Sequence, residues 1–358
     1  MKIAIVSTIW EKVPPEKYGG TELVVYNLAE GLVKNGHKVT VFASGNSKTS
    51  ARLVSVVPKT LREMGIGWNE FLYPLLNLTQ ALDMEKEFDI IHVQFNTRVD
   101  YFVLPFARYL KTPIVSTMHF EMPTTPDKAN RKIFLEKYRE HPLVTISNAQ
   151  RKIPNLNYVA TVYNGIEVDK FDFNDQPEDY LFWMGRFSES KGPREAIQVA
   201  KKTGQKLILA GKIDEMNPEY MEYYHQEVEP HFDNKQIIYF GEANHEQKNK
   251  LLRNAKALLN LIQWDEPFGL VPVESMATGT PVIATKRGSM PELIKDGETG
   301  FLVKDVDGAI ETLKKIDQID RKVCRQHVME NFSVSKMVAD YEKVYLEIIN
   351  NFPREKRS

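Results

Sequence analysis

Cysteine is almost absent from this sequence, in which Cys324 is the only one among 358 residues. A single thiol excludes an internal disulfide framework and a zinc site built on cysteines, and it is typical of a reducing compartment. Long apolar runs are also missing, since none approaches the roughly 20 residues that a membrane-spanning helix needs. The apolar start Ile3–Val6 stops at Ser7, which is too short for a signal sequence and suits a buried strand. We therefore expect a cytoplasmic protein without a membrane anchor, for which only peripheral membrane contact stays open.

An excess of charge is the third absence. The 47 Lys and Arg residues balance 48 Asp and Glu residues, so the formal net charge is −1 and gives no reason to expect a nucleic-acid partner. Hydrophobic residues make up 42% of the chain and charged residues 27%, a balance that is typical of globular proteins and excludes general disorder. A chain of this length is longer than one typical domain, and we expect two.

Short β-branched runs alternate with helical patterns from the start of the chain. Ile3–Val6 is followed by a helical pattern over Glu22–Lys34 and by a second run at Lys38–Phe42, an order that is typical of a βαβ unit. Further strands are predicted at Ile90–Val93, Ile114–Thr117 and Leu143–Ile146. This alternation predicts one parallel sheet covered by helices.

A turn-rich stretch, Asn157–Asp175, interrupts the alternation, and we place a linker between two domains there. The pattern then resumes with a helix at Pro193–Lys202 and strands at Tyr180–Met184, Lys206–Ala210, Gln236–Phe240, Ala257–Leu261 and Val282–Ala284. The predicted fold class is α/β, with two Rossmann-like βαβ domains over residues 1–163 and 164–336 that face each other across a cleft. A last helix over about residues 337–352 carries an apolar stripe, which packs either on its own domain or back on the first.

The most informative segment covers residues 264–274. It places Glu266 and Glu274 eight positions apart after a predicted buried strand. If Glu266 lies on a loop and Glu274 on a helix that begins near Phe268 and ends at Gly279, both carboxylates can face one ligand. Free backbone N–H groups at the start of that helix suit a phosphate, and carboxylates accept hydrogen bonds from sugar hydroxyls. A nucleotide sugar carries both kinds of group.

This pair of glutamates resembles the E-x7-E motif of family 4 of the retaining glycosyltransferases, which have the GT-B fold. Residues 279–284 and 297–303 are also similar to that family, and the similarity covers nearly the whole chain. The resemblance implies that Glu266 contacts the hydroxyls of the donor sugar and that Glu274 binds the ribose of the nucleotide. The helix start at Phe268, Gly269 and Leu270 completes the predicted donor site. Two solvated helix carboxylates are the simpler alternative.

Arg186 and Lys191 follow the first strand of the predicted second domain, on a loop that leads into a helix. Such loops lie at the carboxyl edge of a parallel sheet, where open α/β folds bind their ligands. A guanidinium and an ammonium there would neutralise the phosphates of a departing nucleoside diphosphate, and the same two positions do so in similar glycosyltransferases. A pair of exposed surface cations is the alternative, and the nearby glutamate motif disfavours it.

Gly19 and Gly20 join the first strand to the first helix and allow a ligand to approach the backbone closely. They are not part of a G-x-G-x-x-G sequence, so the fingerprint of a dinucleotide-binding dehydrogenase is missing. In similar transferases a glycine loop at this point faces the donor phosphates and the acceptor. Taken alone, the glycine pair is simply a turn before a helix.

Two histidines follow or end predicted strands of the first domain. The family resemblance makes His119 an active-site residue that contacts the donor hexose, although position alone allows a structural role. Glu121 either joins His119 or is a surface carboxylate. His92 either ends a strand of the sheet or contributes to the acceptor site.

Other aromatic and basic groups have simpler interpretations. Trp10, Trp68 and the stretch 71–76 either pack in the core or line an acceptor groove. The basic residues Lys248, Lys250 and Arg253 are interpreted as a solvated helix face without a partner.

We predict a retaining hexosyltransferase that moves a sugar from a nucleoside-diphosphate sugar to an acceptor hydroxyl, with retention implied by the family resemblance. UDP-sugar is favoured over GDP-sugar because of its frequency in the family, and the acceptor is a carbohydrate, a lipid-linked group or a small molecule. We expect no metal or other cofactor, because two cations and a helix start can stabilise the leaving diphosphate. The alternatives are a GT-B sugar-nucleotide epimerase and a non-catalytic sensor of nucleotide sugars.

Overall fold

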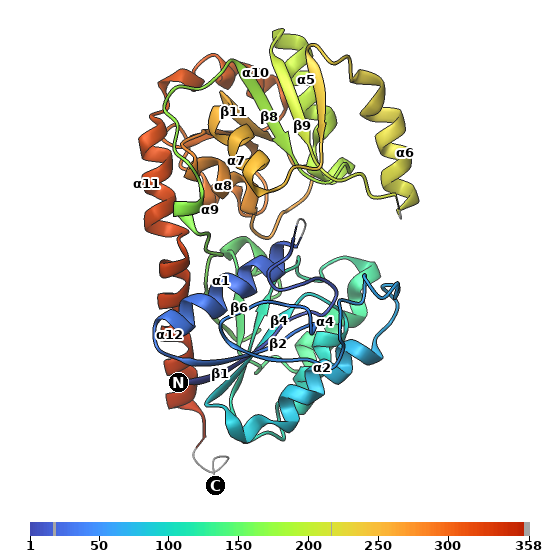
Figure 1. Cartoon of the computed structure of the whole chain (residues 1–358), viewed down its shortest axis with the longest axis vertical. Helices are drawn as coiled ribbons and strands as arrows, with labels where there is room; N and C mark the ends of the chain where they lie inside the picture. Colours follow the sequence, from blue (N-terminus) through green and yellow to red (C-terminus); the bar gives the residue numbers. More distant parts are fainter. Residues whose placement is uncertain (17–18, 216, 354–358) are drawn as a thin grey trace. The chain divides into compact units, whose positions relative to one another are not determined.

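A computed structural model describes residues 1–16, 19–215 and 217–353 of the chain. It divides into two compact units, of which the first contains Met1–Gly165 and Val334–Ser358 and the second contains Ile166–Ser333. Each unit is built on a parallel β-sheet with helices packed against it (Figure 1). The predicted fold class, two Rossmann-like α/β domains, is confirmed.

The sheet of the first unit has the strand order β3-β2-β1-β4-β5-β6-β7 in the residues described. Its strands are β1 Lys2–Val6, β2 Lys38–Phe42, β3 Arg52–Val54, β4 Ile90–Phe95, β5 Ile114–Met118, β6 Leu143–Thr145 and β7 Tyr158–Thr161. All neighbouring strands pair in parallel. From β1 the chain adds β2 and β3 on one side of the sheet, and it then adds β4 to β7 on the other side. The carboxyl ends of β1 and β4 therefore form a topological switch point, where open α/β sheets bind their ligands.

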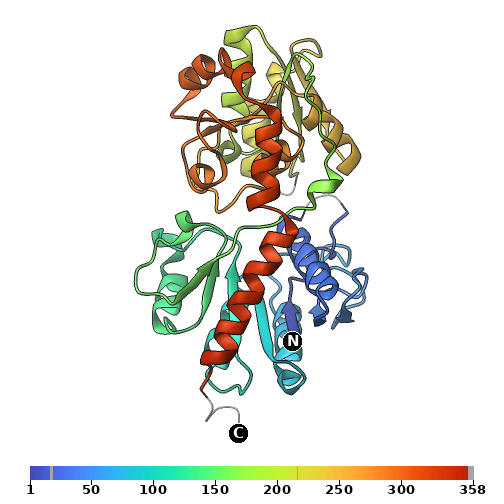
Figure 2. The same cartoon turned by 90° about the vertical axis from the view of Figure 1, so that its left-hand side faces the viewer.

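Helices cover both faces of this sheet. They are α1 Gly20–Lys34, α2 Leu72–Asp83, α3 Val103–Phe106, α4 Ala129–Lys137 and the C-terminal α12 Val334–Asn351. Apolar residues of α2, α3 and α4 share one core with every second residue of β4. On the opposite face α12 lies along the sheet beside α1, where an added Cβ on Gly31 would come within 2.5 Å of Val338 Cγ2 (Figure 2). The predicted C-terminal helix therefore belongs to the first unit.

The second unit repeats the pattern with the order β10-β9-β8-β11-β12-β13. Its strands are β8 Tyr180–Met184, β9 Lys206–Ala210, β10 Ile237–Gly241, β11 Ala257–Asn260, β12 Val282–Thr285 and β13 Gly300–Val303. Its helices are α5 Pro193–Thr203, α6 Pro218–Glu227, α7 His245–Asn254, α8 Leu270–Ala277, α9 Met290–Leu293, α10 Val306–Leu313 and α11 Arg321–Asn331. The switch point of this sheet lies between β8 and β11.

Two details differ from the prediction. The turn-rich stretch interpreted as a linker contains the boundary between the two units, after Gly165, but it begins with β7, an edge strand that pairs with β6. The helix expected near Phe268 begins at Leu270, because Gly269 has a φ of 118° and is the residue that precedes the first helical turn. Within the described ranges, every helix is too short or too polar to traverse a lipid bilayer.

Candidate active site

The loops after β8 and β11 leave the same edge of the second sheet side by side. The two strands pair directly, with Leu181 opposite Ala257 and Phe182 opposite Leu258. The first loop carries Arg186 and Lys191, and the second carries Glu266. The switch point of the sheet therefore places three of the residues that the sequence analysis selected on neighbouring loops.

Glycine packing holds these two loops against each other. Gly192 is in the left-handed region with φ 67°, and a Cβ there would lie 1.9 Å from the carbonyl oxygen of Leu261. The backbone N–H of Gln263 donates to the carbonyl of Ser190 at 2.8 Å, and the Trp183 indole N–H donates to the carbonyl of Lys191 at 3.0 Å. These contacts thus fix the backbone position of Lys191.

Lys191 and Glu266 form an ion pair, with 2.5 Å between Nζ and Oε1. Their side chains remain 28% and 16% exposed, so a ligand can reach both. The Lys191 ammonium also lies 5.1 Å from the centre of the Trp264 ring. The N–H of Ser289 donates to the carbonyl of Glu266 at 3.0 Å, which anchors the loop. The pair presents a cation and a carboxylate side by side.

Arg186 has surroundings that the sequence did not indicate. Its Nη1 lies 3.9 Å from Asp214 Oδ2, and its guanidinium carbon lies 5.5 Å from the centre of the Tyr220 ring. Asp214 follows β9 and Tyr220 lies on α6, so only the folded chain shows that they approach Arg186. The guanidinium side chain is 30% exposed and accessible to an anion.

The start of α8 offers backbone donors rather than side chains. Gly269 precedes the helix without a side-chain cap, and a Cβ at that position would come within 2.8 Å of Met290 Cε. The Phe268 side chain is buried and packs against Phe332 with 6.0 Å between ring centres. Of the predicted group 268–270, Phe268 can therefore meet a ligand only through its backbone.

Glu274 is a buried carboxylate with a partner. Its Oε1 accepts a hydrogen bond from Lys248 Nζ at 2.5 Å, and the two side chains are 4% and 14% exposed. The prediction that Lys248 lies on a solvated helix face without a partner is wrong, because this residue of α7 points toward α8. The interpretation of Glu274 as a solvated helix carboxylate is excluded by the same contact.

Gly19 and Gly20 lie at the start of α1, after the carboxyl end of β1. Gly19 has a φ of 151°, and a Cβ there would lie 2.7 Å from Pro15 Cβ, so a larger residue would be strained. Close by, the buried Glu22 accepts a hydrogen bond from Thr8 Oγ1 at 3.0 Å, and burial raises the pKa of Glu22.

His119 follows β5 at the same edge of the first sheet. Its Nε2 lies 2.6 Å from Gln94 Oε1, and burial lowers the pKa of His119 to about 3. His92 is fully buried inside the sheet layer, so its alternative role at an acceptor site is excluded. Glu121 forms an ion pair with Lys128.

The two tryptophans of the first unit stack on each other, with 4.3 Å between ring centres. Trp10 is buried and belongs to a small core cluster, whereas Trp68 is 60% exposed and lies near the guanidinium of Arg62. Phe71 and Leu72 beside it are also exposed. Trp10 therefore packs in the core, as one of the two interpretations has it, whereas the exposed side chains leave the acceptor groove as a prediction.

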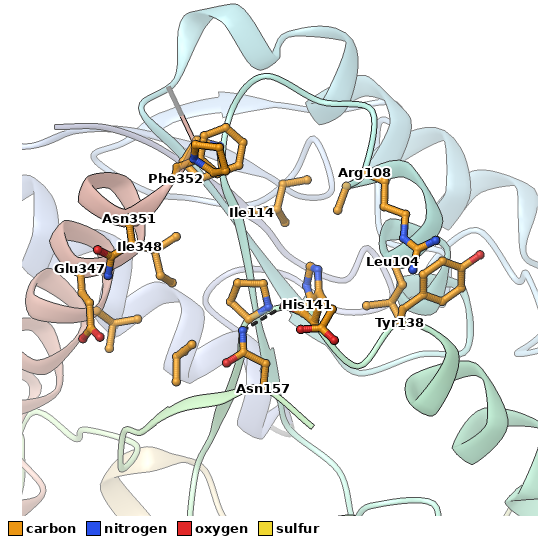
Figure 3. Close-up of a pocket in the computed structure, with 17 residues that line it drawn as sticks. Leu104, Arg108, Ile114, Tyr138, His141, Asn157, Glu347, Ile348, Asn351 and Phe352 are labelled. Atoms are coloured by element: carbon orange, nitrogen blue, oxygen red, sulfur yellow. Dashed lines mark hydrogen bonds between the residues drawn. The ribbon is translucent and has the colours of Figure 1, made fainter. Parts of the chain in front are cut away.

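A cavity of about 540 Å³ lies in the first unit at the amino-terminal ends of the strands, whereas His119 follows a carboxyl-terminal end (Figure 3). Pro113, Pro142 and Asn157, which precede β5, β6 and β7, contribute to its lining. The close-up shows Arg108 next to Tyr138 on one wall and Asn351 of α12 on the other. This cavity is at the amino ends of the strands, away from His119, so its size does not make it the active site.

The described part of the chain contains no group of three or more His, Cys, Asp or Glu side chains placed to hold a metal ion. The candidate site of the second unit contains Arg186, the ion pairs Lys191–Glu266 and Lys248–Glu274, and the start of α8.

Comparison with known proteins identifies the class. Residues 166–326 match the family model of glycosyl transferases group 1, and residues 18–170 match that of glycosyltransferase family 4. Together with the two Rossmann-like sheets, these matches place the chain in the group 1 glycosyltransferases of the GT-B fold, as the sequence resemblance predicted. The protein is a glycosyltransferase.

Individual relatives span the whole chain. It is 25% identical to the N-acetyl-α-D-glucosaminyl L-malate synthase of Bacillus anthracis, over 98% of each chain. The sucrose-phosphate synthase of Thermosynechococcus elongatus has a TM-score of 0.78 and 18% identity, over 98% of this chain and 99% of that one. HepE of Anabaena, solved with UDP-glucose, has a TM-score of 0.71 and 17% identity, over 97% and 100%. The solved structures share the fold.

Proposed function

We propose that the protein transfers a hexose from a UDP-sugar to an acceptor hydroxyl with retention of anomeric configuration. The observation that carries the proposal is the Lys191–Glu266 pair at the switch point of the second sheet. A phosphate oxygen can replace Glu266 as the partner of Lys191, which releases the carboxylate for a sugar hydroxyl. A ligand with adjacent phosphate and sugar groups satisfies both residues at once.

Each predicted residue has a role in this proposal. Arg186, Lys191 and the backbone N–H groups at Gly269 and Leu270 stabilise the diphosphate as it leaves. Glu266 accepts hydrogen bonds from the hexose, and Glu274 binds the ribose. The roles assigned in the first unit are contacts of Gly19 and Gly20 with the donor phosphates and of His119 with the hexose.

The chemical step proposed is a same-face substitution at the anomeric carbon. The bond from that carbon to the phosphate oxygen breaks, and the acceptor oxygen bonds to the carbon on the face that the phosphate leaves. The departing phosphate takes the proton of the acceptor hydroxyl. Protein groups contribute by positioning the reactants and by stabilising the negative charge that develops on the diphosphate.

The nature of the substrates is supported by the relatives. HepE, which has the same fold, was solved with UDP-glucose, and this supports UDP as the nucleotide. The name of the B. anthracis synthase includes L-malate, a small hydroxy acid, which supports a small molecule as one of the predicted classes of acceptor. Retention is carried over from the resemblance to family 4.

The experiment that tests the proposal separates the two glutamates. We expect Glu274→Gln to weaken binding of UDP and of the UDP-sugar alike by about tenfold or more, because a hydrogen bond to a charged group contributes roughly 1.5–3 kcal/mol. Glu266→Gln should leave UDP affinity nearly unchanged and lower kcat/KM for transfer by a similar factor. Calorimetric titration with UDP and a transfer assay measure the two quantities. Normal UDP binding by Glu274→Gln, with binding lost in Glu266→Gln, would reverse the assignment.

The same assay with labelled sugar distinguishes the alternatives. Transfer of label to an acceptor supports the proposal, a change of sugar configuration on the nucleotide supports an epimerase, and binding without turnover supports a sensor. We expect a chelator to leave the rate unchanged, because cations of the protein already face the diphosphate. A rate that is abolished by the chelator and restored only by Mg²⁺ or Mn²⁺ would contradict metal independence.

A further inference from the structure

A cluster of buried polar side chains lies between the sheet of the first unit and α12. It consists of His92 and Gln94 on β4, Thr117 on β5, and Tyr341 and Tyr345 on α12, and we call it the β4–α12 cluster. All five residues are buried. Gln94 connects this cluster to His119.

Gln94 has an amide whose orientation follows from its neighbours. Its nitrogen lies 3.1 Å from each ring nitrogen of His92, and its oxygen lies 2.6 Å from Nε2 of His119. A position equidistant from both ring nitrogens lies over the imidazole, where an N–H group is attracted to the π-electrons and a carbonyl oxygen is repelled. The amide oxygen therefore faces His119, and Nε2 of His119 must donate a proton to it.

His92 is held in place by two further hydrogen bonds. Nδ1 lies 2.7 Å from the hydroxyl of Tyr345, and Nε2 lies 2.7 Å from Oγ1 of Thr117. Thr117 Oγ1 in turn lies 2.9 Å from the hydroxyl of Tyr341. Burial lowers the pKa of His92 to about 3 and raises the pKa of both tyrosines, so every member of the cluster is neutral and hydrogen-bonded.

These contacts determine which atom of His119 is available to a ligand. A neutral imidazole has one N–H donor and one acceptor nitrogen. Since Nε2 donates to Gln94, Nδ1 carries the lone pair, and no hydrogen bond joins Nδ1 to any of the residues that the structure describes. A nitrogen lone pair accepts a hydrogen bond from a hydroxyl and repels a phosphate or a carboxylate.

We propose that Gln94 fixes His119 as the Nε2–H tautomer, and that Tyr341 and Tyr345 of the C-terminal helix act as positioning residues that hold Gln94 through His92 and Thr117. Nδ1 of His119 then accepts a hydrogen bond from a hydroxyl group of the ligand. That this hydroxyl belongs to the hexose of the donor rests on the proposed function. The tautomer and its control by the cluster do not depend on it.

The first test observes the tautomer directly in the whole protein. Long-range ¹H–¹⁵N correlation spectra report which ring nitrogen of each histidine carries the proton. We expect His119 to be protonated at Nε2 at neutral pH, to become a mixture of tautomers in Gln94→Leu, and to regain the Nε2–H form in Gln94→Glu, whose carboxylate also accepts. Protonation at Nδ1 in the unsubstituted protein would overturn the inference, whatever the stability of the variants.

The second test examines the far end of the cluster. Tyr345→Phe removes the hydroxyl that binds His92, and we expect a detectable fraction of the other His119 tautomer. Tyr101→Phe is the matched control, because Tyr101 is a buried tyrosine of the same unit whose hydroxyl has no hydrogen-bond partner among the described residues. Identical His119 spectra in Tyr345→Phe and Tyr101→Phe would overturn the positioning role of α12.

Transfer kinetics then separate this inference from the proposed function. We expect Gln94→Leu to lower kcat/KM at least tenfold and Tyr345→Phe to lower it several-fold, while both retain normal UDP affinity and Tyr101→Phe retains full activity. If the tautomer changes as expected but transfer does not, His119 does not contact the reacting sugar and that part of the proposed function fails. If the tautomer is unaffected by either variant, the inference itself fails.

Discussion

Lys248 is the residue through which the buried carboxylate of the second unit can be tested most directly. Lys248→Met keeps an unbranched side chain with an apolar stem but removes the ammonium group that lies 2.5 Å from Glu274 Oε1. Breaking a buried ion pair from one side costs about 3–5 kcal/mol, because the remaining charge has no partner. We expect a lower denaturation midpoint in urea and UDP binding weakened by about tenfold or more, since Glu274 loses its fixed position.

The same helix supplies the control. Lys250 on α7 is exposed, so Lys250→Met should leave both the midpoint and UDP affinity unchanged. In the double variant Lys248→Met/Glu274→Gln the unpaired charge is gone, and we expect stability to recover while UDP affinity does not. If Lys248→Met were as stable as Lys250→Met, the buried pair would not exist in solution.

His141 predicts how the first unit responds to acid. Its Nε2 lies 2.8 Å from Ser116 Oγ, and burial lowers its pKa from 6.5 to about 3. The unfolded chain takes up this proton below about pH 6.5 but the folded chain does so only near pH 3. The stabilisation is therefore complete above pH 6.5 and is lost as the pH falls toward 3, by up to about 1.4 kcal/mol per pH unit.

We expect His141→Gln to lower the slope of the unfolding free energy against pH, between pH 6.5 and 4, by up to about 1.4 kcal/mol per pH unit. Chemical denaturation at a series of pH values measures the slope. His225→Gln is the surface comparison, because that side chain is 53% exposed. An unchanged slope in His141→Gln would show that the folded protein accepts the proton as readily as the unfolded chain.

Individual residues also show where sequence reasoning ends. Arg186, Lys191 and Glu266 could be selected because each follows a recognisable strand, and the carboxyl ends of parallel strands share one edge. Lys248, Asp214 and Tyr220 come from helices and a loop whose approach to the site depends on packing across the unit. A lysine on a polar helix has the same sequence pattern whether it faces water or a buried carboxylate.

At the scale of elements, Gly192 shows what joins the two site loops. Gly192 and Gly204 both have left-handed backbones, with φ of 67° and 70°. A Cβ at Gly192 would lie 1.9 Å from the Leu261 carbonyl, whereas one at Gly204 would have nothing within 4 Å. Alanine at either position costs roughly 1–2 kcal/mol of backbone strain, but only at Gly192 must the loop after β8 also move away from β11.

We therefore expect Gly192→Ala to be several kcal/mol less stable than Gly204→Ala. It should also lose transfer activity, because the displaced loop carries Lys191. Urea denaturation and the transfer assay measure the two effects on the matched pair. Equal losses in both variants would mean that the contact with Leu261 does not hold the loop.

The accuracy of the predicted elements depended on their place in the sheets. The strands β2, β8 and β9 have the predicted bounds and the other predicted strands differ by one or two residues at one or both ends, because most of these strands contain a buried, mainly apolar run. β3 and β7 lie at the edges of the first sheet and are only partly buried, so their sequences carry no such run. The stretch around β7 therefore resembled a linker.

At the scale of the whole molecule, the two units differ in how they use the chain. The second unit consists of the continuous segment Ile166–Ser333, and the first combines Met1–Gly165 with the C-terminal segment. An amphipathic stripe on α12 indicated a helix that must be buried, but it could not indicate against which sheet. Contacts of Tyr341 and Tyr345 with Thr117 and His92 settle the choice.

This division of the chain sets an order for synthesis on the ribosome. The strands β1 to β7 are synthesised before the second unit, and α12 is synthesised after it. His92 therefore lacks its contact with Tyr345 until the whole second unit has been translated. We expect a fragment of residues 166–333 to protect its amides from hydrogen exchange on its own, and a fragment of residues 1–165 to do so only after a peptide of residues 334–353 is added. The half of the enzyme that is translated first would then be the last to mature, and a nascent chain stalled before α12 would be a substrate for chaperones.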